Sequence, residues 1–331
     1  MFSKKIDFLA IGDTVVDAFI KLKEAHVTCN INKENCEICM KFADKIPFES
    51  ATVVSAVGNS PNAAVSAARL GLSSALISDI GDDGYSRDCL TSLKNNGVST
   101  KYMTTHGHMK TNYHYVLWYG DERTILVNHE EYPRKFPALS TPRYIYLSSL
   151  GSNSESYHNE LADYLAKNSE VKLAFQPGTF QIKLGYEKLK RIYERTFVFF
   201  CNKEEAQRIL GSKEEDSKKL MDMLRTRGPK VIVMTDGPKG AYAYDGTNTY
   251  FMPPYPDPKS PYERTGAGDA FSSTLTVALA LGKSLEEALM WAPINSASVV
   301  QHIGAQEGLL TQKELLEWLA RAPSDYKPQK I

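Results

Sequence analysis

The stretch RTGAGDAF at residues 264–271 is the most informative part of the sequence. Gly266 and Gly268 stand just before a helical run at residues 270–281. Their backbone N–H groups can point at an anion, and a helix N-terminus adds a partial positive charge there. Asp269 brings a carboxylate into the first turn. Transfer of a phosphoryl group to a hydroxyl needs both a group that stabilises developing negative charge and a base, and this motif could supply both. The alternative interpretation of the motif is an ordinary glycine turn that caps a helix.

Composition narrows the class of protein. A chain of 331 residues is long enough for one large α/β domain with an appendage, or for two domains. With 39 basic and 39 acidic residues, the formal net charge is 39 − 39 = 0, so no nucleic-acid partner is expected. No apolar run approaches the roughly 20 residues of a membrane span, and strand-like residues 6–11 leave no room for a signal peptide. We therefore expect a cytoplasmic enzyme.

The five cysteines are not spaced as a disulfide framework, so reduced thiols are the expectation. Four residues with metal-binding side chains lie close together in the sequence: His26, Cys29, Cys36 and Cys39. Such a group can hold a tetrahedral zinc ion. The alternative is that these residues alternate on two short strands and are simply buried or partly exposed.

Short β-branched or aromatic runs alternate with helical patterns along the chain. Several of the runs lack polar alternation, as in a parallel sheet that is covered on both faces. This alternation predicts a doubly wound, mostly parallel α/β sheet between helices. The expected strands are 6–12, 75–80, 143–148, 171–175, 196–201 and 231–235, and the expected helices are 61–70, 86–96, 155–167, 204–210, 214–227, 269–281 and 285–301.

Two stretches break this rhythm, at approximately residues 15–57 and 111–130. Both alternate like strands without a convincing long helix, which predicts a small β-sheet inserted into the main domain; a pair of decorative hairpins is the alternative. The polar tail, residues 323–331, is expected to be loosely held.

The segment TGAGDAF at 265–271 resembles the C-terminal signature of the PfkB (ribokinase-like) carbohydrate and nucleoside kinases. Residues 57–71, VGNSPNAAVSAARLG, resemble the N-terminal signature, although Asn59 replaces its second glycine. Further matches follow in the right order over nearly all of the chain. The resemblance implies a single ribokinase-like α/β domain over 1–331, with the small β-sheet as a lid over the substrate. In some members this lid also pairs with a second subunit, so a homodimer is an expectation.

The resemblance assigns chemical roles to the glycine-rich stretch and to residues near the first strand. Asp269 would be the general base, and the amides of Gly266, Ala267 and Gly268 would hold the charge that develops. The acceptor would be held by a group of residues around the end of the first strand and the N-terminal signature. This group is Asp13, Asp17, Gly58, Asn59 and Asn62, of which Asp13 has turn capping as its alternative role.

ATP is the implied phosphate donor, with Mg²⁺ as its metal. Glu205 would hold Mg²⁺ through water, in keeping with the hydration of this ion. The implied nucleotide contacts are Asn202, Thr235, Gly237, Gly240, Thr265 and Asn295. The chain departs from the family at two further positions: Gln176 stands where many relatives have Asp, and Glu263 stands where Asp is usual, which bears on a monovalent-cation site beside the anion cradle.

The acceptor divides the kinase hypothesis. A small sugar is preferred because residues 120–126 resemble the lid strand of the sugar kinases. A nucleoside is the alternative, since Tyr113, Tyr115, Trp118 and Tyr119 offer aromatic faces to a base. A catalytically silent sugar- or nucleotide-binding regulator also stays open. A dinucleotide-binding protein is disfavoured because no Gly-x-Gly-x-x-Gly follows the first strand, and the Walker A pattern is absent.

Overall fold

The computed structural model describes residues 5–29, 36–120 and 122–331. Its main sheet is parallel from β7 through β13 and antiparallel from β13 to β16. In spatial order the strands are β16 (Gln329–Lys330), β15 (Thr249–Met252), β14 (Ala241–Tyr244), β13 (Val231–Thr235), β12 (Thr196–Asn202), β11 (Lys172–Phe175), β10 (Tyr144–Leu147), β1 (Phe8–Ile11), β6 (Ser74–Ile80) and β7 (Ser99–Thr105).

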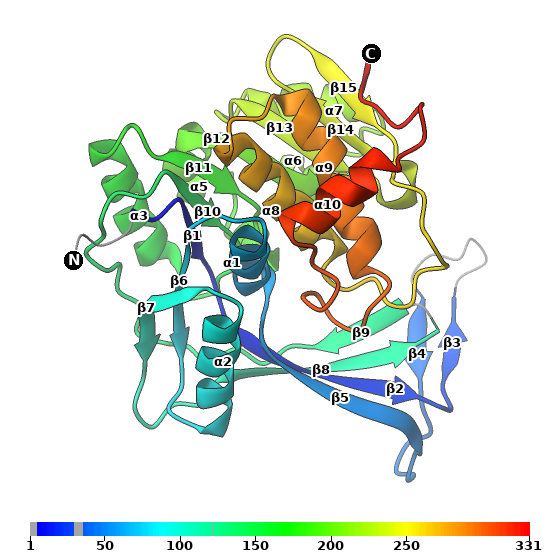
Figure 1. The fold of residues 1–331 in the computed structure, drawn as a ribbon. Coiled ribbons are helices and arrows are strands. Elements are labelled where there is room, and N and C mark those ends of the chain that lie inside the picture. The colour runs from blue at the N-terminus through cyan, green and yellow to red at the C-terminus, as the bar shows by residue number, and fades with distance from the viewer. Residues whose placement is uncertain (1–4, 30–35, 121) are drawn as a thin grey trace.

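Helices cover both faces of this sheet, which confirms the expected fold class (Figure 1). Buried side chains of one face pack against α1 (Asn59–Arg69), α2 (Gly84–Asn95), α8 (Ala267–Ala280), α9 (Leu285–Val299) and α10 (Gln312–Ala320). The other face packs against α3 (Glu155–Lys167), α5 (Tyr186–Arg195), α6 (Lys203–Leu210) and α7 (Ser217–Arg225). The shorter elements are α4 (Thr179–Leu184) and η1 (Gly237–Lys239). In the described parts of the chain, no helix is both long and apolar enough to cross a membrane.

A second sheet lies apart from the main one and runs beneath it in Figure 1. We call it the lid sheet; its order is β5 (Phe48–Val57), β2 (Val15–Leu22), β8 (Asn112–Tyr119) and β9 (Glu122–Leu126). These strands come from the two segments that broke the α/β rhythm. Strands β2 and β8 pair in parallel, and their register places Asp17 opposite His114. The sheet therefore brings chain segments about a hundred residues apart to one site.

Two local expectations are wrong. The tail is not loosely held, since Gln329–Lys330 forms β16 against β15 and Tyr326 is buried, with its hydroxyl donating to the Met290 carbonyl at 2.7 Å. Packing of an aromatic anchor overrides the polar composition of this segment. The helix expected over 214–227 begins only at Ser217, because Asp216 caps it by accepting the Lys219 N–H at 3.0 Å.

The cysteine expectation is also corrected. Cys29 and Cys36 form a disulfide at the ends of a small hairpin, β3 (His26–Thr28) and β4 (Glu37–Cys39). A disulfide sulfur has no thiolate to offer a metal, so the proposed zinc set loses two of its four ligands. His26 pairs with Cys39 across the hairpin, and Cys39 stays a free, exposed thiol. Among the described residues, no group of three or more His, Cys, Asp or Glu side chains is placed to bind a metal.

Candidate active site

A cavity of about 420 Å³ lies where strand ends of the main sheet, the start of α8 and the lid sheet meet. It has a polar lining from both sheets that includes four carboxylates, those of Asp13, Asp17, Glu205 and Asp269. The lining includes Asp13, Asp17, Gly58, Asn59, Asn62, His114, Arg123, His129, Ser149, Gln176, Asn202, Glu205, Thr235, Thr265, Gly266, Gly268 and Asp269. Sequence segments that were assigned separately to a base, an acceptor site and a nucleotide site thus face one space.

The N-terminus of α8 is built for close approach. Gly266 caps the helix in the left-handed conformation, with φ of 81°. A Cβ atom there would collide with Ala305, so glycine is required at this position. At Gly268, in contrast, no described heavy atom outside the helix's own backbone and its chain neighbours lies within 4 Å of where a Cβ would be. The first N–H groups of a helix have no partners within it, so this open turn can receive an anion.

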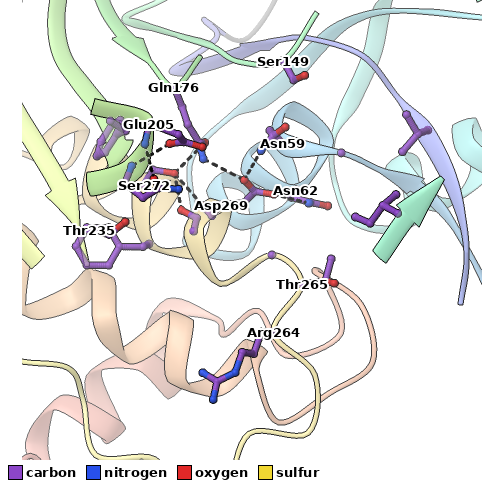
Figure 2. A pocket seen from close by; sticks show the side chains of 18 of the residues that line it. Asn59, Asn62, Ser149, Gln176, Glu205, Thr235, Arg264, Thr265, Asp269 and Ser272 are labelled. Carbon is purple, nitrogen blue, oxygen red and sulfur yellow. Dashed lines mark hydrogen bonds between the residues drawn. The ribbon is translucent and has the colours of Figure 1, made fainter. Parts of the chain in front are cut away.

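Asp269, in the first turn of α8, is held by three side-chain amides (Figure 2). Asn59 donates to Oδ1 at 2.7 Å, Asn62 donates to Oδ2 at 2.8 Å, and Gln176 donates to Oδ1 at 3.2 Å. Burial raises the pKa of Asp269 above 3.8, even though these hydrogen bonds act in the opposite direction. The carboxylate is therefore both positioned and more basic than an ordinary aspartate.

Further hydrogen bonds orient two of these amides. The Oδ1 atom of Asn62 accepts from Gln306 Nε2 at 2.9 Å, so the amide NH₂ group of Asn62 faces Asp269. The Oε1 atom of Gln176 accepts from the hydroxyls of Tyr146 and Ser272, which turns its NH₂ group the same way. The sequence assigned Asn59 and Asn62 to the acceptor; in the structure both line the cavity and their amide groups donate to Asp269, so contact with an acceptor stays a prediction.

Asp13, a second aspartate in the cavity lining, has charged partners. Arg134 Nη2 lies 2.7 Å from Oδ1, while His129 Nδ1 and the Gly151 N–H lie 3.0 and 2.8 Å from Oδ2. Burial would raise its pKa, but His129 and Arg134 together bring the pKa below 3.8. Gly58 lies against the Asp13 backbone and has φ of 113°. A Cβ on Gly58 would lie only 2.8 Å from the Asp13 carbonyl oxygen, so this close approach requires glycine.

Asp17 lies on β2 and faces His114, whose Nδ1 is 3.3 Å from Asp17 Oδ1. Sequence reasoning found both aspartates but missed His114, His129 and Arg134. Strand alternation at 112–119 was the available signal for His114. Nothing local pointed to His129 or Arg134, which lie in the connection between β9 and β10.

Asn202 and Glu205, which the resemblance assigns to the nucleotide and its metal, line the cavity and form a reciprocal cap at the start of α6. The Asn202 side chain accepts the Glu205 N–H at 2.8 Å, and Glu205 Oε2 accepts the Asn202 N–H at 2.9 Å. Burial raises the pKa of Glu205, and the nearby negative charge of Asp269 acts in the same direction. A cavity wall where two carboxylates resist ionisation suits a hard cation, which would stabilise both in the charged form.

The other predicted nucleotide residues are divided. Thr235 and Thr265 line the cavity, whereas Gly237 and Gly240 lie in the turn beyond it. Asn295 is a correction: it is fully buried, donating to Thr274 Oγ1 at 2.8 Å and accepting the Leu310 N–H at 2.9 Å. It joins α9 to α8 and is not available to a ligand.

Glu263 is occupied by protein groups. It accepts the Thr265 N–H at 2.7 Å and the Gly304 N–H at 3.4 Å, and Arg123 of the lid sheet lies 3.7 Å away. Its side chain is only 1% exposed. Glu263 thus fixes the loop before α8; a monovalent cation there stays a prediction.

Comparison with known proteins agrees with this geometry. Residues 21–312 match the family described as pfkB family carbohydrate kinase. Ribokinase from Bacillus subtilis is 30% identical over 270 residues, covering 80% of this chain and 87% of the relative. Among solved structures, a nucleoside kinase from Methanocaldococcus jannaschii superposes with a TM-score of 0.78 at 20% identity, covering 96% of this chain and 100% of that one. Arabidopsis thaliana ribokinase, solved with ribose and ATP, superposes with a TM-score of 0.76 at 19% identity, covering 95% of this chain and 99% of that one.

The two structural likenesses establish the fold. The family match and the bacterial relative, which each cover most of the chain, establish the type of reaction as well. The chain belongs to the pfkB family of carbohydrate kinases and is an ATP-dependent phosphotransferase.

Proposed function

We propose that the protein transfers the γ-phosphate of ATP to a hydroxyl of a small sugar, with Asp269 as general base. The observation that carries this proposal is the placement of Asp269: its carboxylate lies in the first turn of α8, beside open backbone N–H groups, and burial raises its pKa. A carboxylate has about four acceptor positions. Three are taken by amides, which leaves one for the hydroxyl that is to be deprotonated.

The amides of Gly266, Ala267 and Gly268 would stabilise the charge that develops on the transferred phosphoryl group. Donors that are already aimed at this charge lower the barrier, because they need no reorganisation during the reaction. Mg²⁺ bound with ATP would neutralise phosphate charge, and Glu205 is the residue we assign to its hydration shell. Thr235 and Thr265 lie on the same side of the cavity.

A sugar is favoured over a nucleoside by the character of the acceptor end. Asp13, Asp17 and Ser149 make it polar, and carboxylates bind sugar hydroxyls with strength and direction. The tyrosines and tryptophan considered for base stacking do not line the described cavity. Trp118 instead packs edge-on against Tyr262, with ring centroids 5.0 Å apart.

The experiment is an ADP-release screen with Mg-ATP against D-ribose, D-fructose, adenosine and inosine, with Asp269→Asn run beside the wild type. We expect turnover with a sugar that is lost in the variant. Turnover with nucleosides alone would replace the sugar by a nucleoside acceptor. Silence across the panel, with ATP still binding, would favour the regulator.

We also propose that the lid sheet forms a homodimer interface. It exposes large apolar side chains that a single chain does not cover: Phe48 is 55% exposed, Val53 53% and Leu126 52%. Light scattering on the eluting protein should give twice the chain mass, and Val53→Lys should shift it toward one chain mass. A monomeric wild type at micromolar concentration would remove this proposal.

A further inference from the structure

Gln306 is a buried glutamine that lies behind Asn62, one of the residues that line the cavity. It belongs to the connection between α9 and α10, is 6% exposed, and does not itself line the described cavity. Its Nε2 atom donates to the Ala56 carbonyl at 2.7 Å and to Asn62 Oδ1 at 2.9 Å. The proposed reaction assigns no role to Gln306, so these two contacts need an explanation of their own.

The contacts fix the direction of a chain of amides that ends at Asp269. A backbone carbonyl oxygen can only accept, so the Gln306 group that faces Ala56 is the NH₂ group. This group has a second proton for Asn62, and the Asn62 atom that faces it must then be the amide oxygen. The NH₂ group of Asn62 is left for Asp269 and donates to Oδ2 at 2.8 Å. A main-chain oxygen thus determines which end of the Asn62 amide faces Asp269.

The main-chain group at the start of this chain is held from both sides. Ala56 lies near the end of β5, is fully buried, and has a left-handed backbone with φ of 62°. Such a conformation is costly for a residue with a Cβ and persists only where the surroundings hold it. The Ala56 N–H donates to Cys89 Sγ at 3.2 Å, while the Ala56 carbonyl accepts from Gln306. Because β5 belongs to the lid sheet, Gln306 connects a lid strand to Asn62.

The main chain of Gln306 is anchored to the two helices that carry the site. Arg69, the last residue of α1, donates through Nη1 to the carbonyls of Gln306 and Leu309, both at 2.8 Å. The preceding residue, Ala305, packs so closely against Gly266 that a Cβ on the glycine would collide with it. Gln306 therefore has a defined place relative to both α1 and the N-terminus of α8.

We propose that Gln306 is a positioning residue for Asp269: its NH₂ group keeps the NH₂ group of Asn62 turned toward the Asp269 carboxylate. That Asp269 is the base rests on the proposed function; the orientation of Asn62 does not. Without the donor at residue 306, the Asn62 amide is free to rotate and to bring its oxygen toward the carboxylate. The hydrogen bond from Asn62 lowers the pKa of Asp269, so the loss of Gln306 raises that pKa.

Ionisable side chains from neighbouring elements also act on Asp269. The positive charge of Arg123, on β9, lowers the pKa of Asp269. Glu205 of α6 and Tyr146 of β10 are titratable groups whose own pKa values are raised by the negative charge of Asp269. A substitution at residue 306 changes none of these three residues. A change in the pKa of Asp269 in such a variant therefore reports the loss of the Gln306 amide.

The first test measures the pKa of Asp269 in substrate-free protein whose aspartates carry ¹³C in the carboxyl group, with Asp269→Asn identifying the signal. Gln306→Met removes the donor and should raise this pKa by about one pH unit, the scale of a hydrogen bond to a charged group. The matched control is Gln181→Met, because Gln181 is 1% exposed and also donates two buried hydrogen bonds through Nε2. An unchanged pKa in Gln306→Met, or the same rise in both variants, would overturn the positioning role.

The wild type supplies a test that requires no variant to fold. Neutron diffraction on crystals of the substrate-free protein locates the hydrogens of both amides, which ordinary X-ray data do not show. It should show one Nε2 hydrogen of Gln306 directed at Asn62 Oδ1, and one Nδ2 hydrogen of Asn62 directed at Asp269. An Asn62 amide in the reverse orientation would overturn the inference.

A double-mutant cycle tests whether Gln306 acts through Asn62. In the Asn62→Ala background, Gln306→Met should leave the pKa of Asp269 where Asn62→Ala alone places it, because the group that Gln306 orients is already absent. Effects that simply add would mean that Gln306 only supports the fold, and would overturn the positioning role.

Kinetics with the sugar found in the screen separate this inference from the proposed function. In Gln306→Met, the acid limb of the kcat profile should move to higher pH together with the pKa of Asp269, while the KM for ATP stays constant. A pKa that rises without any change in the kcat profile would support the positioning of Asp269 by Gln306 and overturn the assignment of Asp269 as base.

Discussion

Two buried aspartates of the cavity lining, Asp269 and Asp13, have different kinds of neighbours. Asp269 is 8% exposed and has three neutral amide donors, and its pKa lies above 3.8. Asp13 is 3% exposed and has Arg134 and His129, and its pKa lies below 3.8. Burial alone would raise both pKa values. The direct partners differ: Arg134 and His129 contact Asp13, whereas among the described residues Asp269 accepts only from amides, and the charge of Arg123, which also lowers its pKa, does not outweigh burial.

This difference separates two chemical tasks. A base must be able to take a proton, so neutral donors that position Asp269 without neutralising it suit the role we propose for it. A residue that binds hydroxyls as a carboxylate must stay ionised, so the guanidinium of Arg134 suits the role we propose for Asp13. Uncharged Gln176 belongs to this logic, because an aspartate in its place would put a second negative charge beside the base.

The largest expected effect comes from removing the proposed base. Asp269→Asn should lower kcat by about 10²-fold or more, because the hydroxyl loses its proton acceptor. The KM for ATP should change little. Steady-state kinetics with the sugar found in the screen measure both, with surface Asp222→Asn as the control. A kcat within a few-fold of the wild type would remove Asp269 from the proton transfer.

The next largest effect is expected from removing the positive charge that faces Asp13. Arg134, whose side chain is 2% exposed, faces two carboxylates. Arg134→Gln should lower the free energy of unfolding by about 3–5 kcal/mol, because it leaves buried charge uncompensated. Denaturant unfolding measures this. The exposed pair of Arg191 and Asp163 offers the control: Arg191→Gln should cost at most about 1 kcal/mol.

The same variant has a pH signature. Since the folded pKa of Asp13 is depressed, its contribution to stability is present above about pH 4 and is lost as pH falls through the folded pKa. Without Arg134 that pKa rises, so the acid loss of stability in Arg134→Gln should begin at a higher pH. Parallel acid-unfolding curves for the variant and the wild type would mean that Arg134 does not keep Asp13 ionised.

A smaller effect is expected from the carboxylate that we assign to Mg²⁺. Glu205→Gln should raise the Mg²⁺ concentration for half-maximal activity about 10-fold, the scale of an outer-shell contact to a metal. Its exposed neighbour gives a matched control, Glu204→Gln, which should keep the wild-type Mg²⁺ dependence. If the two variants respond alike, Glu205 does not face the metal.

The smallest effect is expected from Gln176→Glu, which replaces a neutral neighbour of Asp269 by a charged one. Gln176→Glu keeps the oxygen that accepts from Tyr146 and Ser272 but puts a carboxylate oxygen near Asp269. The like charge should raise the pKa of Asp269 further, and the acid limb of the kcat profile should move up by about one pH unit. Gln301→Glu, at a half-buried position outside the described cavity lining, should leave the profile in place. An unmoved limb would show that Asp269 does not control it.

Local features of the site were predictable from sequence. The N-terminus of α8 and the cap formed by Asn202 and Glu205 depend on residues at most a few positions apart, and such signals survive in any tertiary context. The partners of Asp269 were not predictable as partners. Asn59 and Gln176 lie 210 and 93 positions away from it, so only packing of α1 and β11 against α8 brings them together.

The errors have the same origin. The zinc hypothesis counted metal-binding residue types, but the hairpin brings Cys29 and Cys36 within bonding distance of each other. Asn295 resembled a ligand contact because its neighbours match the family; it is enclosed between α9 and α8. The tail was judged by its polar composition, although a single buried Tyr326 is enough to hold it.

By itself, the sequence determined the α/β architecture and the family, and it singled out Asp269 and the preceding glycines as the proposed base and anion cradle, because hydrophobic periodicity and short motifs are written in neighbouring residues. Only the tertiary structure decided which charges face each aspartate. That choice depends on pairing of β2 with β8 and on the return of the chain past Asp13. A carboxylate's pKa is set by what lies within a few ångströms of it in space, and distance along the chain says little about that.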